Sequence, residues 1–211
     1  MLNSLYKKIL DLIFPQTDLE EEIHNLSSDQ LSLKLSLKER GSVVSLFTYS
    51  DPLIRAMIWR LKYKRDTHVA RLFAHNLSDY LMEELSDGMI FSEGIRCVII
   101  PLPLSKKRER ERGYNQITLI TDALQTCGEY TVSTDILKRI RHTPPQTSLR
   151  KKEDRASNIS GVFEVRNNVD LKDTHIILID DVLTTGSTLM EAQQTLKENG
   201  VYNVSCIALT H

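Results

Sequence analysis

The chain has 211 residues, of which 41% are hydrophobic and 26% are charged, and it carries a formal net charge of −1. This composition is typical of a folded globular protein and excludes a disordered or collagen-like chain. The apolar runs are only a few residues long, whereas a membrane span needs roughly 20. No signal peptide is visible, because charged residues interrupt the apolar start of the chain, and the three cysteines stand singly. We therefore expect a cytoplasmic protein without membrane insertion.

Residues 1–42 are expected to form a small helical appendage. Apolar residues recur at helical spacing between positions 2 and 13, which predicts a first helix. Residues 31–37 are ambiguous, because leucines alternate with polar residues as in a strand, while residues 27–30 have the pattern of a helix-starting capping box. We favour a short helix here, and a main domain over residues 43–211.

Strand and helix patterns alternate along the main domain. The expected strands are 43–49, 97–100, 176–179 and 204–209, and the expected helices start at Pro52 and Thr67 and cover 115–126 and 188–199. Parallel strands joined by helices form sheets that are covered on both faces. The sequence therefore predicts an α/β fold with a parallel sheet flanked by helices on both faces.

The segment from Ile176 to Thr188 carries the clearest chemical signal. A buried strand brings Asp180 and Asp181 to its carboxyl end, which is where ligands bind in open α/β sheets. A turn of threonine, serine and glycine follows and leads into a helix, whose first N–H groups and dipole attract phosphate. Two carboxylates beside this turn suit a phosphorylated sugar, with Mg²⁺ nearby.

Two commoner nucleotide-binding motifs are absent from the sequence. The turn has one glycine and no lysine, so it is not a P-loop, and the eight glycines are too far apart for a dinucleotide-binding G-x-G-x-x-G. A P-loop NTPase and a dinucleotide-dependent enzyme are therefore excluded.

This segment resembles the phosphoribosyl pyrophosphate (PRPP) motif of type I phosphoribosyltransferases. More narrowly, residues 43–211 resemble the ComF family of competence-associated, phosphoribosyltransferase-like proteins. Besides the PRPP motif, the matching blocks are RLKYK at 60–64, IPLP at 100–103, RERERGYNQ at 108–116, RHTPPQ at 141–146 and the stretch 149–163. One such block could arise by chance, but several in order are specific. The implied architecture is the type I phosphoribosyltransferase fold.

The resemblance implies roles for the matching residues. Asp180 and Asp181 would hold the ribose hydroxyls and Mg²⁺, directly or through water, and with Arg112 they would be the catalytic residues. The other implied PRPP-binding residues are Thr184, Thr185, Gly186, Ser187 and Thr188 at the 5′-phosphate, together with Leu102, Pro103, Lys106, Arg108, Asn115, Gln116, Arg141, Gln146 and Arg155. The basic segment 139–155 would close over the site and exclude water.

The implied activity is transfer of the phosphoribosyl group to an unidentified acceptor with release of pyrophosphate. Thr184 stands where several purine-salvage relatives of this fold have an acidic residue, and threonine cannot act as a base near neutral pH. PRPP binding is therefore better supported than transfer. ComF relatives commonly carry a zinc-binding cysteine module near the N-terminus, but no cysteine precedes Cys97 here, so we expect no zinc.

A basic region supports a second hypothesis. Residues 101–155 contain twelve Lys and Arg against seven Asp and Glu, a net charge of +5. The alternative function is a non-catalytic competence protein that handles single-stranded DNA during uptake, for which a basic groove with stacking aromatic residues is expected. Tyr114 and Tyr130 are the only aromatic residues in this region.

Two blocks also have simpler interpretations. Lys62 and Tyr63 fit the basic end of a helix better than a ligand contact. Residues 112–116 fit a turn and helix start, with Asn115 as the cap, and only the family resemblance favours a site there.

Overall fold

The computed structural model describes residues 16–86, 96–141, 161–166 and 171–211. Its centre is a six-stranded sheet in the order β1-β2-β8-β7-β3-β4. The strands are β1 (Leu35–Arg40), β2 (Val43–Phe47), β3 (Arg96–Pro101), β4 (Thr131–Val132), β7 (Thr174–Val182) and β8 (Val204–Thr210). All neighbouring strands are parallel except β1, which pairs antiparallel with β2.

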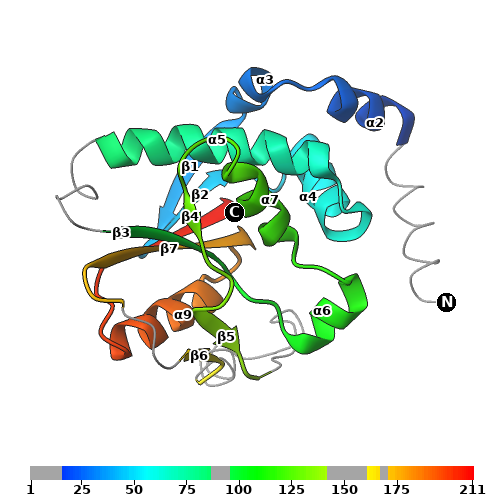
Figure 1. The fold of residues 1–211 in the computed structure, drawn as a ribbon. Coiled ribbons are helices and arrows are strands. Elements are labelled where there is room, and N and C mark those ends of the chain that lie inside the picture. The colour runs from blue at the N-terminus through cyan, green and yellow to red at the C-terminus, as the bar shows by residue number, and fades with distance from the viewer. Residues whose placement is uncertain (1–15, 87–95, 142–160, 167–170) are drawn as a thin grey trace.

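Helices cover both faces of this sheet (Figure 1). One face carries α4 (Pro52–Lys64), α5 (Thr67–Ser86) and α7 (Gln116–Leu124), and the other carries α9 (Ser187–Glu198) and a small sheet of β5 (Leu137–Arg139) and β6 (Phe163–Val165). Successive residues of β7 contribute to the two cores in turn, because side chains alternate along a strand: Ile177 and Ile179 lie in the first, and Ile176 and Leu178 lie in the second. The predicted covered parallel sheet is confirmed.

The expected helix over residues 31–37 is only partly right. The capping box exists, since Ser27 Oγ accepts from the Gln30 N–H and Gln30 Oε1 accepts from the Ser27 N–H at 2.9 Å. However, α3 (Ser28–Ser32) is short, and β1 follows it as a solvent-exposed edge strand. The alternating leucines thus mark a strand, and Gly41, with φ of 63°, turns it into β2. The sheet therefore includes residues on both sides of position 43.

Residues before β1 share the main core. Ile23 of α2 (Gln16–Asn25) and Leu31 of α3 are fully buried in the same cluster as the inner faces of α4 and α5. No helix within the described ranges is both long and apolar enough to cross a membrane.

The connections around β3 and β7 diverge. From β7 the chain runs through α9 to β8, whereas from β3 it runs through α6 (Lys106–Arg112) and α7 to β4, on the opposite side and face. Such a change of direction opens a crevice at the carboxyl ends of the two central strands, where open α/β sheets bind ligands. The residues that follow β3 and β7 therefore form the candidate site.

The shared core predicts that Leu31→Ala destabilises the whole protein. Burial of this side chain is complete, and deleting a buried leucine side chain costs about 2–5 kcal/mol. Equilibrium denaturation should show a single transition, with the free energy of unfolding lowered by that amount. Leu33→Ala is the matched control, because Leu33 is 85% exposed. An unchanged midpoint for Leu31→Ala would show that α3 is not part of the cooperative unit.

Candidate functional site

The two aspartates at the end of β7 face opposite sides of the sheet. Asp181 continues the face of Ile179 and meets Lys62 from α4 and Gln116 from α7. Asp180 lies on the other face. The two carboxylates therefore have separate surroundings despite being adjacent in the chain.

Asp181 is the anchored member of the pair. Its Oδ2 atom lies 2.7 Å from Lys62 Nζ and accepts a hydrogen bond from Gln116 Nε2, also at 2.7 Å. Arg112 in turn donates to Gln116 Oε1 at 2.8 Å. Burial alone would raise the pKa of Asp181, but the charge and hydrogen bond of Lys62, with Arg112 and Gln116, hold it below its ordinary value. Asp181 is thus ionised near neutral pH.

Asp180 has the opposite character. Burial and the neighbouring charge of Asp181 raise the pKa of Asp180 to about 7, although the Asp181 N–H, Lys62 and Arg108 partly offset this. The charge of Asp180 also acts on Arg139 of β5, whose guanidinium lies 5.5 Å from the Phe163 ring. Burial and the like charge of Arg108 lower the pKa of Arg139, while Asp180 raises it. Two arginines on this face can therefore meet an anion beside Asp180.

Tyr114 ties the end of α4 to the segment before α7. Its hydroxyl donates to the Leu61 carbonyl and accepts from the Arg65 N–H at 2.9 Å. Gly113, with φ of 77°, ends α6 and allows the chain to turn toward this contact. The turn of α4 that carries Lys62 is therefore held from both sides.

Asn115 connects α7 to the loop after β3. Its Oδ1 caps α7 by accepting from the Ile117 N–H at 3.0 Å, and its Nδ2 donates to the Leu102 carbonyl at 3.0 Å. Leu102 itself donates to the Ile179 carbonyl at 2.8 Å. The interpretation of Asn115 as a helix cap is confirmed, and the same side chain fixes the loop beside β7.

The turn after β7 has the backbone shape of an anion cradle. Gly186 adopts φ of 80° as the N-cap of α9, and, having no side chain, it cannot cap the first N–H groups itself. The hydroxyls of Thr185 and Ser187 share a hydrogen bond. Arg40 of β1 donates to the carbonyl of Thr184, which braces the turn from the sheet edge. These first N–H groups and the helix dipole can receive a phosphate.

The predicted site residues are not all brought together. Asp180, Asp181, Arg108, Arg112 and Gln116 are coupled by contact or charge, and Leu102 and Asn115 brace them. Pro103 and Thr188 are half-buried in the loops that flank the site, whereas Lys106, Arg141 and Thr184 are exposed. Gln146 and Arg155, and most of the predicted closing segment, lie outside the described residues.

Lys62 is the site residue that the sequence interpretation misses. The helix-end interpretation is correct about its position, and the structure adds a pairing with Asp181 that this interpretation does not include. A signal was present: Lys62 continues the four-residue spacing of Ile54 and Ile58, both buried. A lysine on the apolar face of a helix requires a partner.

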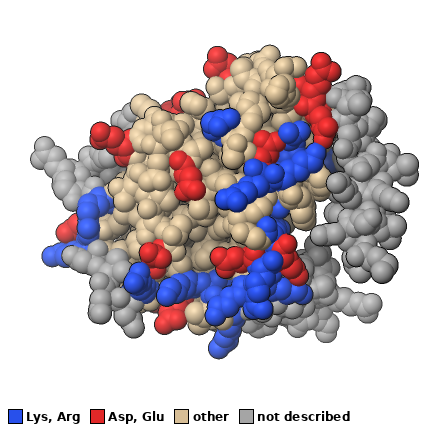
Figure 2. Space-filling view, turned by 45° about the vertical axis from the view of Figure 1, so that its right-hand side comes forward, with Lys and Arg blue, Asp and Glu red and all other residues tan. Residues whose placement is uncertain are grey.

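Aromatic and cationic side chains form one surface beside these residues. The Trp59 and Tyr63 rings lie 5.6 Å apart, and Arg112 lies 5.8 Å from the Tyr63 ring. We call this the stacking surface, and it comprises Trp59, Tyr63 and Tyr114 with Lys64, Arg65 and Arg112. Figure 2 shows that Lys and Arg gather on the side of the molecule where α6 lies, with acidic residues interspersed.

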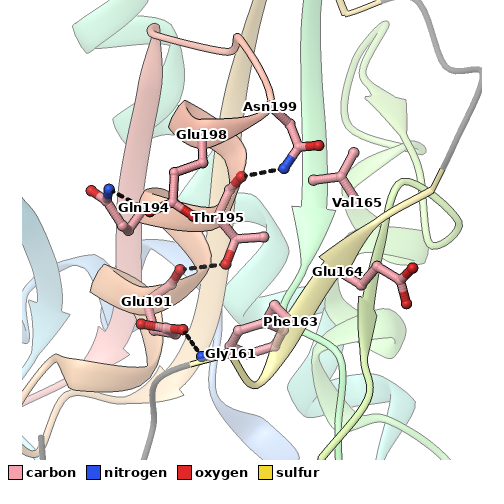
Figure 3. A pocket seen from close by; sticks show the side chains of 9 residues that line it. All are labelled: Gly161, Phe163, Glu164, Val165, Glu191, Gln194, Thr195, Glu198 and Asn199. Atoms are coloured by element: carbon pink, nitrogen blue, oxygen red, sulfur yellow. Dashed lines mark hydrogen bonds between the residues drawn. The ribbon is translucent and has the colours of Figure 1, made fainter. Parts of the chain in front are cut away.

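A pocket of about 510 Å³ lies elsewhere, between β6 and α9. Its lining includes Glu164, Glu191 and Glu198, and Figure 3 shows Glu191 turned toward the Gly161 N–H, to which it is bonded at 2.6 Å. Three carboxylates repel a phosphate ligand. This pocket therefore does not suit the ligand that the turn after β7 favours.

The described residues contain no group of three or more His, Cys, Asp and Glu placed to hold a metal ion. The carboxylates of Asp180 and Asp181 are nonetheless hard oxygen ligands, and Mg²⁺ is commonly held by one or two carboxylates with water and substrate phosphates. They fit a Mg²⁺ that arrives with a phosphorylated ligand.

Comparison with known proteins agrees with this geometry. The model of the phosphoribosyl transferase domain family matches residues 116–211. Competence protein ComFC of Bacillus subtilis is 30% identical over 203 residues, covering 93% of this chain and 76% of that protein. Competence protein F of Haemophilus influenzae is 36% identical over 107 residues, which are 50% of this chain and 46% of that protein.

The chain is also similar to a protein named for DNA utilization and to a solved phosphoribosyltransferase structure. DNA utilization protein YhgH of Salmonella typhi is 30% identical over 171 residues, covering 80% of this chain and 72% of that protein. Among solved structures, a hypoxanthine phosphoribosyltransferase from Trypanosoma cruzi aligns with 66% of each chain at 10% identity and a TM-score of 0.42.

The environment of Asp180 predicts that Asp180→Asn stabilises the ligand-free protein. The pKa of Asp180 is about 3.9 in the unfolded chain and about 7 in the folded protein. Between these two pH values the folded protein keeps a proton that the unfolded chain has lost, so the stability of the fold decreases as the pH rises toward 7. The gain from asparagine should reach about 1 kcal/mol or more at pH 8, which is about 2–4 °C in Tm, and shrink toward pH 5.

Thermal unfolding at pH 5 to 8 measures this, with the exposed Asp135→Asn as the control. A loss of stability at pH 8, or a gain that does not change with pH, would contradict the described environment of Asp180.

Proposed function

The chain belongs to the ComF family and has the type I phosphoribosyltransferase fold, and from this premise we propose that it binds PRPP with Mg²⁺ and transfers the phosphoribosyl group. The observation that carries the proposal is the end of β7, where two differently held carboxylates are followed at once by the Gly186 turn. This arrangement places two carboxylates, which can accept hydrogen bonds from sugar hydroxyls, directly before a turn whose N–H groups can bind a phosphate. It lies at the crevice between β7 and β3, where this topology binds ligands.

Each part of PRPP finds a matching group. Asp180 and Asp181 would accept from the ribose hydroxyls, and the N-terminus of α9 would hold the 5′-phosphate. Arg108 and Arg139, which interact with Asp180 through charge, would meet the pyrophosphate. Arginine suits this contact because its planar group binds phosphate oxygens in pairs.

Transfer breaks the bond between C1 of the ribose and the pyrophosphate oxygen and forms a bond from C1 to the acceptor. Mg²⁺ would supply charge neutralisation on the leaving pyrophosphate. The protein would contribute orientation and positive charge, and Thr184 would not accept the proton of the acceptor, because its hydroxyl does not titrate near neutral pH. We propose that the reaction takes place in the cytoplasm and that the protein uses Mg²⁺ without zinc.

Calorimetric titration with PRPP and Mg²⁺, with pyrophosphate release followed in the same sample, tests this proposal. We expect magnesium-dependent binding that Asp180→Asn/Asp181→Asn weakens at least tenfold, because neither amide carries charge for Mg²⁺. Asp135→Asn is the matched control, being an exposed aspartate far from β7 in the chain. Absence of binding to the unaltered protein, or equal binding by the double variant, would refute the proposal.

A second candidate function is single-stranded DNA handling, which the stacking surface specifically favours. The names of the relatives refer to competence and to DNA utilization. The basic region contributes Tyr114 to this surface, and α4 contributes two further aromatic rings, Trp59 and Tyr63. The guanidinium of Arg112 lies against the Tyr63 ring. Rings interleaved with cations bind single strands without sequence preference.

Tyr63→Ala is therefore expected to weaken binding of an oligothymidylate about tenfold, since stacking of one base contributes about 1–3 kcal/mol. The Tyr63 side chain is 52% exposed. Tyr202→Ala is the matched control, because Tyr202 is 78% exposed and precedes β8, at the amino end of that strand, whereas the site lies at the carboxyl ends of the strands. Fluorescence anisotropy at two salt concentrations measures the effect. Equal affinity of both variants would reject the stacking surface as the binding face.

A further inference from the structure

Lys62 is turned into the site although it lies in the last turn of a helix. Its side chain is 18% exposed, and that of its partner Asp181 is 13% exposed. The next lysine along, Lys64, pairs instead with Glu20 at a more exposed position. A lysine at a helix end ordinarily extends into solvent, so this burial marks a specific contact.

The contact is a clamp on one carboxylate oxygen. Lys62 Nζ and Gln116 Nε2 approach Asp181 from different helices and both meet Oδ2 at 2.7 Å. Within the described part of the chain, no hydrogen bond to the other oxygen, Oδ1, accompanies them. Because both donors meet one oxygen, the carboxylate cannot rotate without breaking two bonds.

Both arms of the clamp are themselves held. Tyr114 bonds the backbone on either side of Lys62, at the Leu61 carbonyl and the Arg65 N–H. On the other arm, Arg112 donates to Gln116 Oε1, which leaves Nε2 directed to Asp181. Supported side chains of this kind hold a binding group in a productive geometry before the ligand arrives.

We propose that Lys62 is a positioning residue for the phosphoribosyl ligand: with Gln116 it fixes Asp181 through Oδ2 and leaves Oδ1 to accept from the ribose hydroxyls. This inference rests on the proposed function and assigns Lys62 of α4 a role in the binding site. A fixed carboxylate loses less conformational freedom when the sugar binds, and the lysine charge offsets the repulsion between Asp181 and Asp180.

Titration of PRPP and Mg²⁺ into Lys62 variants tests this role. Lys62→Met, which removes the donor and the charge, is expected to weaken binding at least tenfold. Lys62→Gln keeps a donor and should lose less, and Lys62→Arg should recover most of the affinity. The matched control is Lys34→Met, because Lys34 pairs with Asp51 at the same 2.7 Å at the other end of α4. This control should bind as the unaltered protein does.

The same titrations in an Asp181→Asn background separate positioning from other roles. If Lys62 acts through Asp181, Lys62→Met should change affinity less than twofold there. A full tenfold loss in that background would show that Lys62 contacts the ligand itself, and the positioning role would be wrong. The positioning role would also be wrong if Lys62→Met lowered Tm without changing the affinity measured well below Tm. Should Lys62→Met fail to fold, unchanged affinity of Lys62→Gln would refute the role instead.

Failure of the unaltered protein to bind would overturn the proposed function and, with it, the positioning role. Binding by the unaltered protein with unchanged affinity in Lys62→Met and Lys62→Gln would overturn the positioning role alone. The two failures are therefore distinguishable.

Discussion

Two neighbouring carboxylates at the end of a buried strand are the constraint on which the site depends. Strand alternation separates Asp180 from Asp181, so that each meets a different face of the protein. One face supplies Lys62 and Gln116, which hold Asp181 in its charged form. The other supplies arginines at longer range, and Asp180 is left with a raised pKa. The pair therefore combines one fixed and one adaptable carboxylate.

The surrounding helices are arranged to support that fixed carboxylate. Tyr114 joins α4 to the segment before α7, and Asn115 joins α7 to the loop after β3. Lys62 and Gln116 are thereby delivered from two helices to one oxygen atom. The stacking surface adjoins the same network, since Arg112 contacts both the Tyr63 ring and Gln116. Gln116 therefore links the two, because it bonds Asp181 on one side and Arg112 of the stacking surface on the other.

The sequence predicts the parts that depend on local order. Asp180, Asp181 and the Gly186 turn are contiguous with a buried strand, so their meeting needs no tertiary information. By contrast, the pairing of Lys62 depends on how α4 packs against β7, and propensity alone places such a lysine in solvent. The position of Arg139 depends on pairing between the three-residue strands β5 and β6, which are too short for a periodic signal. β1 is exposed throughout, so its alternating leucines cover no buried face, and the capping box before it favoured a helix over the strand.

A crystal structure with PRPP and Mg²⁺ bound would locate every part of the ligand at once and is the most informative experiment on this site. We expect ribose hydroxyls within hydrogen-bond distance of Asp180 and of Asp181 Oδ1, the 5′-phosphate at the N-terminus of α9, and an intact contact between Lys62 and Asp181 Oδ2. A ligand bound away from the end of β7, or one that displaces Lys62 from Asp181, would contradict this expectation.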